Sequence, residues 1–451
     1  MNISAFRYSR SFSACLFIFH AALGAIPGSA KETGQVAVRA ESWMQYGRIF
    51  NSTDTVAGQN FNSLSLQSFG VRVYLDKSFS NRMRAVAGAG VIAGHMLPKN
   101  PSSNGGYAPF VASPYIAEAN LTSTLMDEES SKLDLRVGCF PFTYNHDSKD
   151  LGHYLLRAPV YPGIVNSGPS PNLLGFRVRY SIGNFKQDLL LKSETEIAPY
   201  FDLSPAYLAA YDAPAFRIGA GVNLYRFFPI HKKVTDGKYV PKSGNLYPLA
   251  NGETIAFHGT KLMAQAAFDP KVLMRSGEAM GPDDLKIYGE VALLGLDNDS
   301  LHKSVYGDFL HRMPMMAGFN FPTFGLLDNL SIETEWYGAR FSDDLSGYNA
   351  GYGSKQSPLP VVIPVLDSSG QKAIGPDGKP VFENISRDNW KWSLQGAKTF
   401  QSQFQVSLKI ANDHLRPGVY VGEDDARLPG VESIMVASKD WYGMMRLAYF
   451  F

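Results

Sequence analysis

The residues with the greatest chemical capacity are gathered in one segment, YNHDSKDLGHYLLRAPVYPGIVNSGPSPN, which covers residues 144–172. It contains two histidines, two aspartates and one arginine, namely His146, Asp147, Asp150, His153 and Arg157. Imidazole and carboxylate groups are ligands that zinc takes, but their spacing here fits no strong zinc pattern. We therefore predict no metal and no other cofactor, and the segment needs a different interpretation.

Sequence motifs for catalysis do not support an enzyme. The chain contains no G-x-S-x-G elbow and no H-E-x-x-H helix motif. The glycine-rich stretch at 88–94 lies within an alternating run with no helix after it to bind phosphate, so we expect its glycines to make room along a strand. DNDS at 297–300 lacks the glycine and the final glutamate of a calcium loop. A catalytic pair assembled from residues on different strands remains an alternative, with His258 and His414 as candidates. We predict, however, that the protein is not an enzyme.

The elements that position these residues are predicted to be β-strands. In KLDLRVGCFPF, for example, Leu133, Leu135 and Val137 alternate with charged residues, which is typical of a strand whose two faces meet different surroundings. Fifteen such runs are clear, and a sixteenth at 203–212 restores the even number that single-chain bacterial barrels have, although fourteen strands stays open. The predicted strands are 36–49, 63–76, 82–96, 112–125, 132–143, 174–182, 184–195, 203–212, 215–228, 255–268, 285–296, 313–321, 327–340, 389–399, 404–416 and 441–451.

The links between the strands alternate between short and long. Alternation within strands occurs in soluble sandwiches too, but this asymmetry of link length is typical of transmembrane barrels. The sequence thus predicts an all-β, transmembrane antiparallel β-barrel with short periplasmic turns and long extracellular loops. The link at 269–284 is long for a periplasmic turn, and 341–388 is predicted to be a long extracellular loop with a hairpin. The 23 tyrosines and 29 phenylalanines suit aromatic girdles at the membrane boundaries.

The first 30 residues are predicted to be a secretory signal peptide. They contain two arginines, an apolar run and then small residues, so we expect cleavage after Ala30. The mature chain, 31–451, would keep one of the two cysteines, Cys139, and so could form no intramolecular disulfide.

The final stretch, WYGMMRLAYFF, is similar to the terminal strand by which bacterial outer-membrane barrels present themselves to their assembly machinery. Over nearly all of its mature length, the chain resembles the porin-like outer-membrane β-barrels. The resemblance implies a Gram-negative type of outer membrane, with lipid and the barrel-assembly machinery as partners, and it leaves a homotrimer open. The residues predicted to form the assembly signal are Trp441, Leu447, Tyr449 and Phe451.

The charged residues indicate what such a barrel would conduct. Without the signal, the formal charge is 40 − 41 = −1, which gives no indication of a nucleic-acid partner. Sixteen strands leave room for water inside, and rings of arginine and lysine favour anions. We therefore predict passive diffusion of small hydrophilic solutes with a preference for anions; the alternative is that the wall charges pair across strands and select nothing. The predicted pore-lining residues are Arg72, Arg84, Lys132, Arg136, Arg177, Arg179, Arg217 and Lys261.

The segment at 144–172, which contains the histidines and aspartates described above, can be interpreted within this barrel. In general porins, the loop at this ordinal position folds inward and narrows the channel, so by resemblance 144–173 is the candidate constriction loop. An outer loop packed over the barrel mouth is the alternative. The competing function is a plugged structural or receptor barrel that binds a partner through its extracellular loops, and the apolar LPVVIPV within 341–388 favours it.

Overall fold

The computed structural model describes residues 35–52, 55–56, 59–60, 62, 65–95, 110–155, 172–195, 201–225, 227–228, 230, 246–248, 254–256, 259–274, 280–294, 296, 313–336, 362–364, 374–376, 382–384, 390–415, 435 and 437–451. The predicted signal peptide (1–30), Arg157 and most of the predicted loop 341–388 lie outside these residues.

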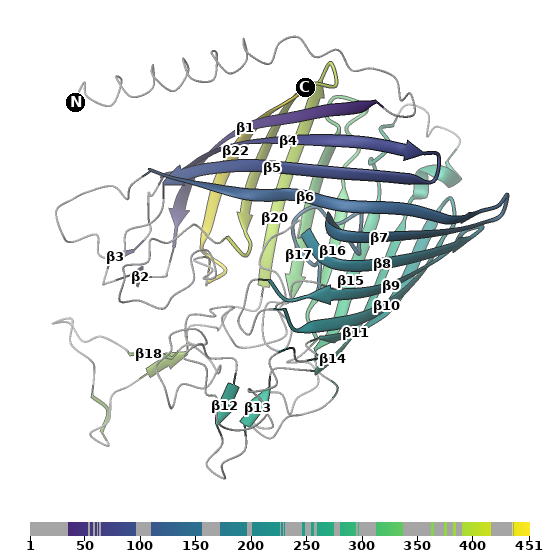
Figure 1. Ribbon diagram of the computed structural model, residues 1–451. Helices are drawn as coiled ribbons and strands as arrows, with labels where there is room; N and C mark the ends of the chain where they lie inside the picture. Colours follow the sequence, from purple (N-terminus) through teal and green to yellow (C-terminus); the bar gives the residue numbers. More distant parts are fainter. Residues whose placement is uncertain are drawn as a thin grey trace.

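Sixteen strands form one closed antiparallel barrel, in which neighbours along the chain pair and the last strand closes on the first (Figure 1). The predicted fold class and strand number are therefore confirmed, including the strand at 203–212 that was added for parity. The barrel strands are β1 (Val36–Asn51), β4 (Ser65–Ser80), β5 (Met83–His95), β6 (Phe110–Asp127), β7 (Ser131–Pro141), β8 (Asn172–Ile182), β9 (Phe185–Ser193), β10 (Leu203–Asp212), β11 (Phe216–Tyr225), β14 (Gly259–Phe268), β15 (Ile287–Leu294), β16 (Met315–Asn320), β17 (Asn329–Trp336), β20 (Trp390–Phe400), β21 (Phe404–Asn412) and β22 (Trp441–Phe450).

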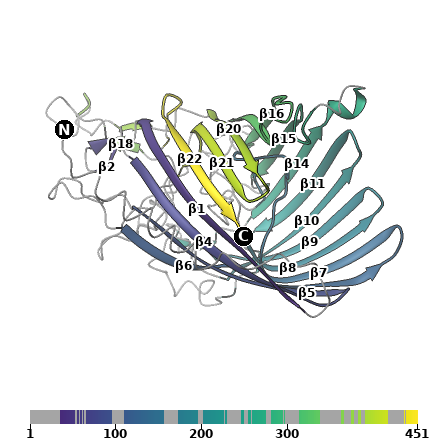
Figure 2. The same cartoon turned by 90° about the horizontal axis from the view of Figure 1, so that it is seen from above.

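Closure of the barrel depends on the terminal strand β22. Its ladder with β1 runs from the pair Glu41 and Phe450 to the pair Asn51 and Trp441, with a register shift before this last pair, and the two strands lie side by side in Figure 2. Because a bilayer offers no hydrogen-bond partners, a spanning sheet must leave no open edge, and this ladder removes the last one.

The two ends of the barrel differ in their links. At the short-turn end, neighbouring strands are joined by the link at 269–286 and by six shorter links, namely 81–82, 128–130, 183–184, 213–215, 321–328 and 401–403. The C-terminus lies at this end, because the Phe450 N–H donates to the Gln403 carbonyl at 2.7 Å. The small pairs at the opposite, long-link end include β12 (Leu246–Pro248) with β13 (Thr254–Ala256), and β18 (Val362–Pro364), whose partner is β19 (Phe382–Asn384) (Figure 1). A further small pair joins β2 (Thr55–Val56) and β3 (Gln59–Asn60).

The link at 269–284, which is long for a turn, has a compact structure where it is described. It begins with the 3₁₀ helix η2 (Pro270–Leu273), whose Asp269 side chain accepts from the Lys271 N–H. It ends at Asp284, which accepts from the backbone N–H groups of Gly281 and Phe324. These capping contacts allow a long link to pack at the short-turn end.

The outward face of the barrel is apolar. Leu75, Leu189 and Leu408 are each at least half exposed, as expected for side chains that meet lipid instead of a protein core. At the short-turn end the outward positions are aromatic, which is the girdle pattern of a membrane boundary. The exposed aromatic residues there are Phe79, Phe185, Tyr211, Phe216, Phe268, Phe400 and Phe404. Among the described residues, no helix has the length and apolar character needed to cross a bilayer.

The four residues predicted as an assembly signal lie on the outward parity of the end of the chain. Trp441 stacks on Phe50 with ring centroids 4.3 Å apart, and Phe451 packs edge-on against Tyr449 at 4.6 Å. Leu447 is opposite Met44 of β1. The role of these residues in assembly remains a prediction.

Candidate functional site

Directly after β7, the chain turns into the barrel interior. We call residues 142–155 the inner segment. Its apolar side chains pack against apolar side chains on the inward face of the wall, and together they form the main buried core. Each fully buried large side chain contributes about 1.5–3 kcal/mol relative to exposure, so this core explains why the segment folds inward. The core consists of Phe140, Phe142, Tyr144, Leu151, Tyr154 and Leu155 with Leu173, Leu190, Ala206, Leu208, Met263, Tyr288, Ala292 and Met316.

The carboxylate of Glu333 on β17 holds the tip of the inner segment. It accepts backbone N–H groups from Lys149 at 2.6 Å, Asp150 at 2.9 Å and Leu151 at 2.8 Å. The Tyr288 hydroxyl also donates to it at 2.8 Å. Burial of a lone carboxylate costs several kcal/mol, but this number of donors makes the buried charge a strong anchor.

Two further glutamates extend the anchor along the wall. Glu290 on β15 accepts the backbone N–H groups of His153 at 3.1 Å and Tyr154 at 2.8 Å. Glu335 accepts the Tyr154 hydroxyl at 2.6 Å and lies 2.5 Å from Nε2 of His414. The backbone of His153 has a φ of 61°, which is uncommon for a residue with a side chain, and the bond to Glu290 helps to hold it there.

Buried lysines bind the carbonyl groups of the same segment. Lys261 on β14 donates to the Tyr154 carbonyl at 2.5 Å and the Leu155 carbonyl at 3.4 Å, and Lys192 on β9 donates to the latter at 3.5 Å. The prediction that Lys261 lines the open pore is therefore wrong. Its parity is inward, but it is 0% exposed because the inner segment covers it.

The aspartates of the inner segment point to the wall. Asp147 pairs with Arg217 at 3.0 Å and Lys286 at 3.6 Å, while Asp150 pairs with Lys409 at 2.6 Å. Burial alone would raise the pKa of Asp150, but the Lys409 ammonium group holds that pKa below its ordinary value of 3.8. These carboxylates therefore fasten the segment and do not present charge to the open passage.

The Asp413 carboxylate, just after β21, shares the same lysine. It lies 2.6 Å from Lys409. Burial and then the negative charge of Asp150 raise the pKa of Asp413 above its ordinary value, although Lys409 acts against this shift. Asp150 therefore keeps its negative charge to a lower pH than Asp413 does.

The two histidines of the inner segment differ in exposure, because the His146 side chain is exposed whereas that of His153 is buried. Partial loss of hydration and the nearby positive charges of Arg217 and Arg179 lower the pKa of His146, so its imidazole is neutral at pH 7. His153 is buried with its Nε2 3.4 Å from the Ser148 hydroxyl. Over the described ranges, no group of three or more histidine, cysteine or acidic side chains is placed to hold a metal ion.

The opposite part of the wall consists of strands β22, β1 and β4 to β8, and its cations are partly exposed. Arg72 and Arg446 flank Glu41 at 2.5 and 2.7 Å, and their side chains remain 34% and 36% exposed. Arg84 pairs with Asp76 and is 42% exposed. The cations here are paired, but they stay in contact with the open interior.

Strand register aligns the arginines of this open part into a row. The direct cross-strand neighbours are Ser78 and Arg84, Arg84 and Thr122, Thr122 and Arg136, and Arg136 and Arg177. The row is thus continuous across five strands, from β4 to β8. In the next row, Arg179 forms a two-point pair with Asp188 at 2.8 and 2.7 Å.

Aromatic rings support several of these guanidinium groups. The Arg136 guanidinium lies 4.8 Å from the Phe140 ring centroid, and that of Arg72 lies 5.9 Å from the Tyr74 ring. The glycines at 88–94 make room for such rings, since a Cβ atom on Gly90 would lie 2.8 Å from the Tyr115 ring. Cation–π contacts of this kind help to position a guanidinium group.

The sequence did not identify the anchoring residues. The alternation of the strands places Glu290, Glu333, Glu335 and Lys409 on the inward parity, but nothing in it marks them as anchors. A usable signal did exist, because Leu190 and several other inward-parity residues of β9 to β16 are apolar. Apolar side chains are out of place on a water-filled wall, and they mark the patch on which the inner segment packs.

Comparison with known proteins adds a likeness in architecture. No protein-family model matches the sequence, and no curated protein matches it. The closed, sixteen-stranded antiparallel wall decides the class. The barrel is porin-like.

Two solved structures illustrate the likeness of this porin-like barrel. A mutant of the Rh. blastica porin is 7% identical, with a TM-score of 0.43, and the match covers 92% of this chain and 100% of that one. Salmonella typhi OmpF, solved in complex with daunomycin, is 10% identical, with a TM-score of 0.46, over 93% of this chain and 98% of that one. At such low identity the likeness concerns the fold.

Proposed function

We propose that the protein is an outer-membrane channel through which small hydrophilic solutes diffuse passively, with a preference for anions. One observation carries the proposal: the inner segment buries three wall glutamates together with Lys192 and Lys261, whereas cations of the opposite wall, such as Arg84 and Lys132, stay partly exposed to the interior. Glu290, Glu333 and Glu335 are 3%, 0% and 0% exposed. In contrast, the side chains of Arg84 and Lys132 are 42% and 48% exposed.

The solute path in this proposal runs between the inner segment and the basic row. The inner segment, as the described part of the candidate constriction loop, narrows the passage from one side. The charges of Arg84, Arg136 and Arg177 act from the other side, within a low-dielectric enclosure that focuses their field. Partial pairing with acids reduces this field without reversing it, so we expect a moderate selectivity that allows many small anions to pass.

The proposed setting is a Gram-negative type of outer membrane. The apolar outward face and the aromatic girdle at the short-turn end support a lipid environment. By the general rule for such barrels, the short turns would face the periplasm and the long links the outside. Strand β22, which closes the barrel, would be the element that the assembly machinery recognises.

The test is single-channel recording of the refolded mature protein in a planar bilayer under a salt gradient. The proposal predicts steady open channels whose reversal potential lies on the anion side. Steady channels with a cation-side reversal would refute the anion preference and keep the channel. Correctly folded, heat-modifiable protein that passes no current would refute the channel and favour a plugged structural or receptor barrel.

A further inference from the structure

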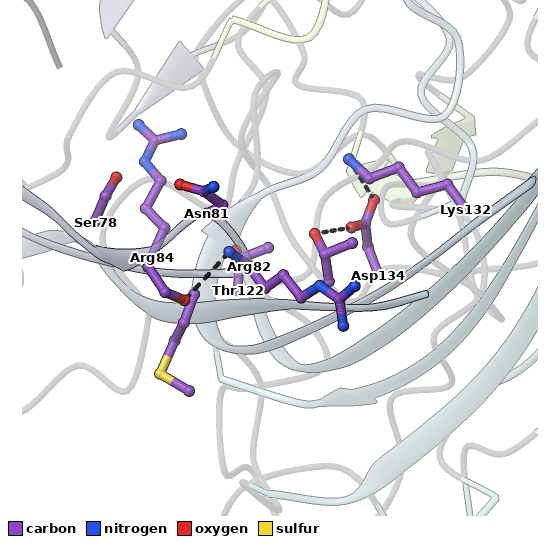
Figure 3. Close-up of a pocket in the computed structure, with 10 residues that line it drawn as sticks. Ser78, Asn81, Arg82, Arg84, Thr122, Lys132 and Asp134 are labelled. Carbon is purple, nitrogen blue, oxygen red and sulfur yellow. Dashed lines mark hydrogen bonds and ion pairs between the residues drawn. The ribbon is translucent and has the colours of Figure 1, made fainter. Parts of the chain in front are cut away.

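A pocket of about 420 Å³ opens at the short-turn end, between strands β4 and β7 (Figure 3). Its volume lies in the range of small-molecule sites. The pocket lies apart from the inner segment, none of whose residues lines it. Its lining residues are Ser78, Ser80, Asn81, Arg82, Met83, Arg84, Thr122, Thr124, Lys132 and Asp134.

The lining of this pocket is positively charged. It combines three cations, Arg82, Arg84 and Lys132, with one carboxylate, Asp134. Lys132 is 3.4 Å from Asp134 and remains about half exposed, while Arg84 is paired with Asp76 outside the lining. In the described part of the chain, no carboxylate lies within ion-pair distance of Arg82. Even with Asp76 counted, one positive charge is in excess.

Neutral donors surround these cations. The Thr122 hydroxyl lies on the strand between Arg84 and Arg136, and Ser78 lies directly across from Arg84. Asn81 projects from the turn between β4 and β5 into the same space, as Figure 3 shows. Guanidinium, ammonium and hydroxyl donors that converge on one space suit a group with several anionic oxygens, which a phosphate provides.

We propose that this pocket binds the phosphate group of a small organic phosphomonoester at the short-turn mouth of the channel. The inference deepens the proposed function and rests on it. The row formed by Arg84, Arg136 and Arg177 begins at the pocket and continues along the open wall. A phosphate held by Arg82 and Lys132 therefore lies beside the start of this row, because Arg84 also lines the pocket and Arg136 is on the same strand as Lys132.

Direct titration tests the pocket without requiring a current. Folded barrel in detergent micelles is titrated calorimetrically with glycerol 3-phosphate, and with glycerol as the uncharged reference. Wild type is expected to bind the phosphate ester and not glycerol. The double variant Arg82→Gln/Lys132→Gln is expected to bind it at least roughly tenfold more weakly, because two charged donors are lost. Asp134→Asn, which removes the only carboxylate of the lining, is expected to bind it more tightly.

Lys186→Gln is the matched control. Lys186 belongs to the same end of the barrel, pairs with Asp212 at 2.6 Å and is 43% exposed, but it is not part of the pocket. Its variant loses one positive charge, as each single substitution of the double variant does, and is expected to bind glycerol 3-phosphate as wild type does. Heat modifiability on gels confirms that each variant is folded before titration.

The outcomes separate this inference from the proposed function. If wild type binds no glycerol 3-phosphate, or if Lys186→Gln weakens binding as much as the double variant does, the pocket inference is overturned. Steady anion current from the same preparation would then leave the proposed channel intact. Binding with the expected variant pattern but without any current would instead support the pocket and refute the channel.

Discussion

The two parts of the barrel wall follow the same alternation and yet have different roles. In the covered half, formed by β9 to β21, Lys192, Lys261, Glu290 and Glu333 are buried beneath the inner segment and bind its backbone. In the open half, formed by β22, β1 and β4 to β8, charged side chains pair with each other and remain partly exposed. An inward parity therefore places a residue inside the barrel but does not decide whether a solute meets it. The inner segment decides that.

The two halves also differ in how much their charged side chains contribute to the stability of the barrel. Removal of a buried carboxylate such as Glu333 leaves several enclosed N–H groups without an acceptor, and each costs about 1–3 kcal/mol. Partly exposed ion pairs such as Arg72 with Glu41 contribute about 0–1 kcal/mol. The covered half thus stabilises the architecture, whereas the open half can change its charges at little cost in stability.

The largest effect is expected from Glu333→Leu in the covered half. The three backbone N–H groups of the inner segment lose their acceptor, so we expect the barrel to be destabilised by about 3 kcal/mol or more and the segment to be released. The midpoint of heat modifiability should fall and the single-channel conductance should rise. Glu333→Gln, which keeps an acceptor oxygen, should show a smaller change. Wild-type conductance and stability in Glu333→Leu would contradict the anchoring role.

A smaller, purely electrostatic effect is expected from Arg136→Gln combined with Arg177→Gln in the open half. The chloride-to-potassium permeability ratio should fall by roughly twofold to fivefold, because two cations of the arginine row are lost. Lys192→Gln is the comparison variant of the covered half, because Lys192 is buried beside the Leu155 carbonyl. It should leave the reversal potential unchanged. An equal shift in Lys192→Gln would contradict the division into two halves.

The smallest effect concerns acid. Because the pKa of Asp150 is lower in the folded protein than its ordinary value of 3.8, its pair with Lys409 contributes its full stabilisation above about pH 4. That contribution is lost as pH falls further, through the depressed pKa. Asp150→Asn is therefore expected to abolish part of any acid-induced change in conductance. Recordings from pH 7 to pH 3 should place that part below about pH 4. An Asp150-dependent change between pH 6 and pH 5 would be inconsistent with this pairing.

The strands could be predicted from sequence because their signal is local. The run at 203–212 was expected at the bounds that β10 has, and Arg136 and Arg177 were assigned to the inward face that they occupy. The covering of the wall could not be predicted in the same way. It depends on which distant strands meet the inner segment, so Lys261 was assigned to the open pore although it binds the Tyr154 carbonyl.

The most direct test of the two-sided wall is a comparison of cysteine accessibility in a Cys139→Ser background. Thr122→Cys places a near-isosteric thiol in the open half, and Ser393→Cys places one in the covered half, where the serine is 0% exposed. A charged, water-soluble thiol reagent added to open channels should change the current rapidly through Thr122→Cys. It should leave Ser393→Cys unmodified on the same timescale. Equal reaction rates at the two positions would show that the inner segment does not separate a covered wall from an open one.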